Sequence, residues 1–116
     1  MKECKFRLGA DQIRPLLPKN YGGCFATDMI TVDGLGVSFM YREEPSFAAD
    51  SGWRFMSGRE SQEYMDDPDN LTIYDVNTIA NYDPGIIPFR DAPMGSAFVR
   101  DVESREFVQI DFNPEE

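Results

Sequence analysis

The sequence contains no histidine, and this absence removes several kinds of catalytic site at once. Ser-His-Asp triads, Cys-His pairs and imidazole metal sites all need that side chain. Only two cysteines are present, Cys4 and Cys24, and their spacing does not form a Cys-x-x-Cys metal or redox motif. We therefore expect two free structural thiols and no catalytic residues, metal ligands or cofactor site.

Long apolar runs are also missing. No stretch approaches the roughly 20 residues that a membrane-spanning helix needs. The first seven residues are rich in charge and lead into no apolar segment, so they do not read as a signal peptide. These features predict a cytoplasmic protein without a membrane partner, in a compartment where thiols stay reduced.

Motifs that bind phosphate or calcium are absent or incomplete. No glycine-rich loop ends in Lys-Ser/Thr. The run Asp66-Asp67-Pro68-Asp69-Asn70 resembles the start of a calcium loop, but counted from Asp67 the fifth position is Leu71 and the glycine position is Thr72. Gly95-Ser96-Ala97 lacks the G-x-S-x-G pattern. We predict that the protein is not an enzyme.

Basic residues are scarce: 11 lysines and arginines face 21 acids, for a net charge of −10. This balance argues against binding to nucleic acid or to an anionic membrane, both of which attract basic side chains. A basic protein is the partner that such a charge favours. The plain alternative is that the acidity only keeps the protein soluble.

The net negative charge comes from one half of the chain. Residues 1–58 carry seven basic and seven acidic residues, whereas residues 59–116 carry four arginines against fourteen acids, which leaves −10. Within residues 59–75 six acids face only Arg59. Like charges this close repel, and a cationic partner relieves the repulsion. We name as candidate partner-binding residues Glu60, Glu63, Asp66, Asp67 and Asp69, with a solvated surface as the equally simple alternative.

A length of 116 residues suits a single domain over residues 1–116, and 41% hydrophobic residues are enough for a core. The pattern predicts an α+β fold, with an antiparallel sheet of about five strands and two or three short helices. Strands are expected over 24–32 and 35–41, joined by Asp33-Gly34 as a two-residue type I′ turn. We also expect a short helix over residues 10–17, which Asp11 would cap.

The rest of the chain is expected to alternate strands and short helices. Trp53 alternates with Phe55 in a third strand, which favours a core position over an exposed interface anchor. Ser57 and Glu60 match a capping box, so a helix should follow Ser57. A brief extended piece over 71–74 precedes a helix that Asp75 caps and Asp83-Pro84 ends. A closing hairpin over 96–101 and 106–112 places Val108, Ile110 and Phe112 in the core.

Taken in order, these segments resemble a bacterial family first described as a domain of unknown function and now known as immunity protein family thirty-three. The resemblance spans about residues 20–100. It is carried by Cys24 to Val32, Met40 to Pro45, Asp50-Ser-Gly-Trp-Arg-Phe55, Ser57-Gly58, Glu63-Tyr64, Asp67 to Asn70, Ile73-Tyr-Asp-Val-Asn-Thr-Ile79, Asp83-Pro84, Ile87-Pro88 and Ala92-Pro-Met-Gly-Ser-Ala-Phe98.

The resemblance implies an immunity protein that lies beside a toxin gene of a polymorphic toxin system and neutralises the toxin in the producing cell by binding it. The implied partner is a basic toxin domain, and the family supplies no catalytic residues. Two other functions stay open on the residues alone. One is a regulatory or adaptor module that binds another protein, and the other is a small carboxylate-dependent enzyme, which would need two acids together in a cleft.

Overall fold

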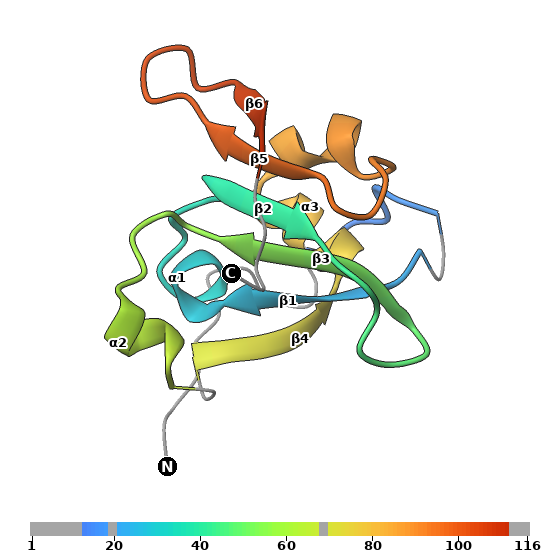
Figure 1. The fold of residues 1–116 in the computed structure, drawn as a ribbon. Helices are drawn as coiled ribbons and strands as arrows, with labels where there is room; N and C mark the ends of the chain where they lie inside the picture. Colours follow the sequence, from blue (N-terminus) through green and yellow to red (C-terminus); the bar gives the residue numbers. More distant parts are fainter. Residues whose placement is uncertain (1–12, 19–20, 68–69, 112–116) are drawn as a thin grey trace.

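The computed structural model describes residues 13–18, 21–67 and 70–111. Six strands form one sheet in the order β4-β1-β3-β2-β5-β6 (Figure 1). The strands are β1 (Gly23–Thr27), β2 (Phe39–Arg42), β3 (Asp50–Met56), β4 (Leu71–Asp75), β5 (Ala97–Arg100) and β6 (Phe107–Ile110). The helices are α1 (Asp28–Thr31), α2 (Gln62–Met65), α3 (Val76–Tyr82) and the 3₁₀ helix η3 (Pro84–Phe89).

The sheet is mixed, whereas the sequence predicted a purely antiparallel one. β1 runs parallel to β3 and antiparallel to β4, and the remaining neighbours pair antiparallel. The α+β class is confirmed, but the sheet has six strands, and a helical turn, α1, follows β1 directly. The parallel pair arises in two steps. The chain leaves β1 through α1 and enters the sheet again as β2, two places away, and it then turns back as β3 into the place beside β1.

The predicted hairpin at Asp33-Gly34 is wrong. The chain folds into a helical turn instead, because the amide of Val32 donates to the carbonyl of Asp28 at 2.8 Å and that of Gly34 donates to Ile30 at 3.1 Å. Gly34 has the positive φ of 71° that was expected, but Asp33 does not share it. A type I′ turn needs positive φ at both central residues. β1 and β2 are therefore not neighbours.

The predicted capping box at Ser57 forms only in part. The Glu60 carboxylate accepts from the Ser57 amide at 2.8 Å as predicted, but the Ser57 hydroxyl accepts from the amide of Arg59 and no helix begins there. The helix begins four residues later, at Gln62, where Ser61 is the N-cap and its hydroxyl accepts from the amide of Tyr64 at 3.1 Å. Asp75 does stand at the N-cap of α3, as expected, but its side chain makes no capping hydrogen bond. Asp83 ends α3, and its carboxylate accepts from the amide of Gly85 at the start of η3.

The predicted helix over 10–17 falls partly outside the described residues, and residues 13–17 are not helical. Asparagine side chains hold this segment against α3. The carbonyl and amide of Arg14 bond to the side chain of Asn81, and the amides of Leu16 and Leu17 donate to Asn77 Oδ1. Leu17 is the buried anchor of the segment.

Among the described residues, none of the helices has the length and apolar character that a membrane span requires.

The core lies between the sheet and a layer formed by α1, α3 and η3. Trp53 is 1% exposed, as predicted, and its ring stacks on Phe55 with centroids 5.9 Å apart. The closing hairpin is confirmed as β5 and β6, but its core face was mispredicted. Phe107 packs on Phe89 of η3, whereas Val108 points the other way and is 50% exposed. Phe112 lies outside the described residues.

Candidate protein-binding surface

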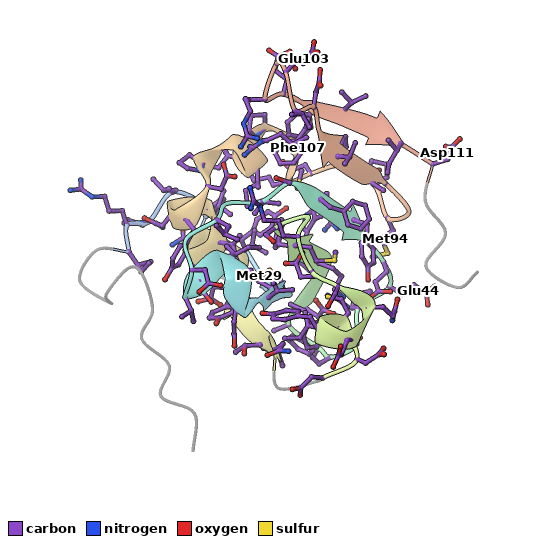
Figure 2. All side chains as sticks on the ribbon, turned by 90° about the vertical axis from the view of Figure 1, so that its left-hand side faces the viewer. Met29, Glu44, Met94, Glu103, Phe107 and Asp111 are labelled. Carbon is purple, nitrogen blue, oxygen red and sulfur yellow. The ribbon has the colours of Figure 1, made fainter. Side chains whose placement is uncertain are left out.

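Four of the predicted acidic residues, Glu60, Glu63, Asp66 and Asp67, lie on or beside α2, which stands on the opposite side of the sheet from α3 and η3 (Figure 2). Glu63, Asp66 and Asp67 are exposed in α2 and the turn after it. The Asp66 carboxylate accepts from the side-chain amide of Gln62 at 2.9 Å, one turn earlier. These three residues therefore form an exposed acidic group, which we call the α2 acids. Asp69 lies outside the described residues.

Glu60 is separated from the α2 acids by its hydrogen bonds. Its Oε2 atom accepts from the Thr27 hydroxyl at 2.5 Å and from the Ser57 amide at 2.8 Å, and its Oε1 atom accepts from the Gly58 amide at 2.9 Å. Burial by itself raises the pKa of this carboxyl, but the hydrogen bonds from Thr27 and Ser57 outweigh it and hold the pKa below its ordinary 4.5. Glu60 thus ties β1 to the end of β3.

We expect Glu60→Gln to cost about 1–3 kcal/mol of unfolding free energy at pH 7, because the amide's NH₂ group must face a backbone amide or the hydroxyl. The folded-state pKa of Glu60 is lowered, so its stabilisation is complete above pH 4.5 and is lost as the pH falls through the folded value. Urea unfolding of both proteins across pH 2–7 checks this. A difference that persists undiminished at the lowest pH would contradict the assignment.

The face of the sheet opposite the core carries mostly apolar side chains, and we call it the open face. Cross-strand partners share a face of a sheet, and β1, β2, β3 and β4 bring Ile73, Phe25, Arg54 and Tyr41 into one row. A second row runs through Met56, Phe39, Val99 and Val108. Ile73, Val99 and Val108 are 54%, 38% and 50% exposed, so this face presents apolar side chains to solvent.

Met65 of α2 lies over this face between two hollows. The first, of about 310 Å³, we call the Glu43 hollow; it is lined by Phe25, Tyr41, Glu43, Ser46, Arg54, Met65 and Leu71. The second, of about 570 Å³, we call the Arg105 hollow; its lining includes Phe39, Met56, Arg59, Met65, Val99, Val102 and Arg105. The α2 acids thus adjoin an apolar, grooved surface.

A buried ion-pair network forms the floor of the Glu43 hollow. Arg54, 5% exposed, donates to both carboxylate oxygens of Asp50 at 3.0 and 2.8 Å, and its Nε donates to Glu43 at 2.6 Å. Its guanidinium also lies 4.7 Å from the centre of the Phe25 ring. Gly52 lets the strands approach here, because a Cβ atom at that position would lie 2.2 Å from the Glu43 carbonyl.

The network sets the charge of the hollow. Burial alone would raise the pKa of Asp50, but the hydrogen bonds from Arg54, Ser46 and Gly52 lower the pKa by more. The pKa therefore lies below its ordinary value, and the carboxyl stays ionised. One guanidinium and two carboxylates leave a net charge of −1 at the floor. The neighbouring Tyr41 hydroxyl has a raised pKa, first because of its burial and then because of the negative charge of Glu43.

The described residues hold no group of three or more Cys, Asp or Glu side chains placed to bind a metal ion. Cys24 is a buried free thiol, and its burial raises its pKa well above the ordinary value. Cys4 lies outside the described residues. The arrangement suits protein binding, since its exposed features are carboxylates beside apolar hollows.

Comparison with known proteins gives one finding. Residues 24–111 match the family model described as the immunity protein Imm33 domain. The chain belongs to the Imm33 family. No curated protein and no solved structure matches this Imm33 chain in those comparisons.

Two residues that helped to carry the resemblance, Trp53 and Asp83, are scaffold in this Imm33 domain. Trp53 is core, and Asp83 accepts from the Val37 amide and pairs with Arg100 at 2.7 Å. The sequence reasoning missed the open face, although one signal was present. Arg54 stands between Trp53 and Phe55, and strict alternation puts it on the face away from the core, where a charged side chain needs partners.

Proposed function

We propose that this protein is a toxin-neutralising immunity protein that binds a basic toxin domain in the producing cell, with no catalysis of its own. Membership of the Imm33 family supports an immunity role and implies a protein toxin as the partner. The α2 acids are the structural observation that supports a basic partner, because Glu63, Asp66 and Asp67 are exposed while Glu60 is held by internal hydrogen bonds.

We further propose that the α2 acids lie at the toxin interface. Glu63 lies in the short helix α2, and Asp66 and Asp67 follow it directly. Met65, the last residue of this helix, lines both hollows of the open face, so a partner that covers this face also meets the acids. Opposite charges at such a rim mainly speed association and set its salt dependence. The binding of a basic toxin here should therefore weaken as ionic strength rises.

Reversal of the α2 acids by Glu63→Lys, Asp66→Lys and Asp67→Lys should weaken toxin binding about ten- to a hundredfold at low salt. The partner is the toxin encoded beside the gene, and titration calorimetry at several salt concentrations gives the affinity and its salt dependence. The salt dependence of the variant should be much smaller than that of the wild type.

The control variant reverses three other exposed acids, Asp33, Asp91 and Glu103, which lie on separate parts of the molecule. It has the same net charge as the first variant, so any general effect of charge is matched. Equal affinities and equal salt slopes for the two variants would show that the α2 acids are not at the interface.

A further inference from the structure

The Glu43 hollow has the size and lining of a pocket for one side chain. Its volume of about 310 Å³ lies at the small end of the range of roughly 300–1,000 Å³ for ligand sites. The walls are the rings of Phe25 and Tyr41 and the aliphatic side chains of Met65 and Leu71. Such walls fit a long, flexible apolar stem better than a compact polar group.

The floor of this hollow is negative and has one carboxylate oxygen to offer. Glu43 Oε2 accepts from Arg54 Nε, but no described residue donates to Glu43 Oε1. The Glu43 side chain is 36% exposed, whereas the Asp50 side chain is fully buried under the Arg54 guanidinium. A cation that enters the hollow therefore reaches Glu43 and not Asp50.

We infer that the Glu43 hollow receives one lysine side chain of the toxin, an inference that rests on the function proposed above. The alkyl stem packs on Met65 and Leu71, and the ammonium binds Glu43 Oε1. Lysine fits better than arginine, because a guanidinium gains most from two oxygens of one carboxylate and Arg54 already holds one of them. A lysine ammonium is a compact charge that needs a single oxygen.

The neighbouring features agree with this assignment. Met65 is the last residue of α2, so the hollow adjoins the helix that carries Glu63. The Arg105 hollow on the other side of Met65 does not suit a cation, because Arg59 and Arg105 line it and its one acid, Glu60, is bonded to backbone amides. The open face thus offers one place for a basic side chain and a separate place for an apolar or acidic one.

The test measures the affinity of the adjacent-gene toxin for two variants of this hollow. Glu43→Gln removes the charge, while its carbonyl oxygen can still accept from Arg54. Ser46→Phe fills the hollow from an exposed loop position without changing a charge. The matched control is Glu44→Gln, which changes the next residue in the same way; Glu44 is exposed and does not line the hollow.

We expect Glu43→Gln and Ser46→Phe each to weaken binding about tenfold or more, and Glu44→Gln to bind as the wild type does. Replacement of one particular lysine of the toxin by Met or Arg should weaken its binding to the wild-type protein by the same factor. The same replacement should not weaken binding to Glu43→Gln any further. Wild-type affinity for both hollow variants, or no such coupled lysine, overturns the inference but leaves the proposed function standing. Failure of the wild type itself to bind overturns both.

Discussion

Replacement of Asp50 by Asn should lower the free energy of unfolding by about 3–5 kcal/mol. The Asp50 side chain is fully buried and accepts four hydrogen bonds: two from Arg54, one from the Ser46 amide at 2.7 Å and one from the Gly52 amide at 2.8 Å. Asparagine offers one oxygen and places an NH₂ group against another donor. Arg54 keeps its ion pair with Glu43 but loses its fully buried pair with Asp50, and breaking a buried ion pair by removing one partner costs about this much.

Asp91→Asn is the matched control for this change. The Asp91 side chain is 76% exposed and its nearest basic group, Arg90 Nε, is 3.9 Å away, so the same substitution should cost less than about 0.5 kcal/mol. Urea unfolding followed by circular dichroism at pH 7 measures both. Similar small losses for Asp50→Asn and Asp91→Asn would mean that the Arg54 network does not hold the strands together as described.

Replacement of Trp53 by Ala should cost a similar amount, about 3–5 kcal/mol, for a different reason. The indole ring is 1% exposed and packs on Phe55 and Phe98, with centroids 5.9 and 6.4 Å away. Its Nε1 atom donates to the Arg90 carbonyl at 2.9 Å and so ties β3 to the end of η3. Removal of the ring leaves a cavity in the middle of the core.

Trp53→Phe separates the two contributions of this side chain. It keeps a ring on Phe55 and loses the hydrogen bond, and the Arg90 carbonyl still accepts from the Tyr21 hydroxyl. The loss should therefore be clearly smaller than for Ala. Val102→Ala, at an 83% exposed position, should be close to neutral. Circular dichroism is the proper signal, since Trp53 is the only tryptophan. A mild Trp53→Ala phenotype would place this residue outside the core.

The sequence predicted those elements whose signals are local. The strand around Trp53 and Phe55, the end of α3 at Asp83-Pro84 and the β5–β6 hairpin all follow from alternation or from a turn residue. The Asp33-Gly34 hairpin failed because such a dipeptide describes only its own turn. The strands that pair with β1 are β3 and β4, both distant in the chain, and no local sequence pattern indicates this pairing.

The candidate surface was predictable in part. The exposed positions of Glu63, Asp66 and Asp67 agree with a cluster read from composition, although their binding role stays a proposal. Glu60 belonged to the same sequence cluster but faces Thr27 on another strand, a contact that only the folded chain creates. The Glu43 hollow brings together five elements and a loop, so no sequence motif could indicate it.

Growth rescue by co-expression tests the central claim most directly. Cells that express the toxin gene adjacent to this one should stop growing, and the wild-type protein should restore growth and co-purify with the toxin as a complex. The variant with reversed α2 acids should rescue less well than the control with Asp33, Asp91 and Glu103 reversed. Continued growth arrest in the presence of folded wild-type protein, with no complex recovered, would contradict an immunity function.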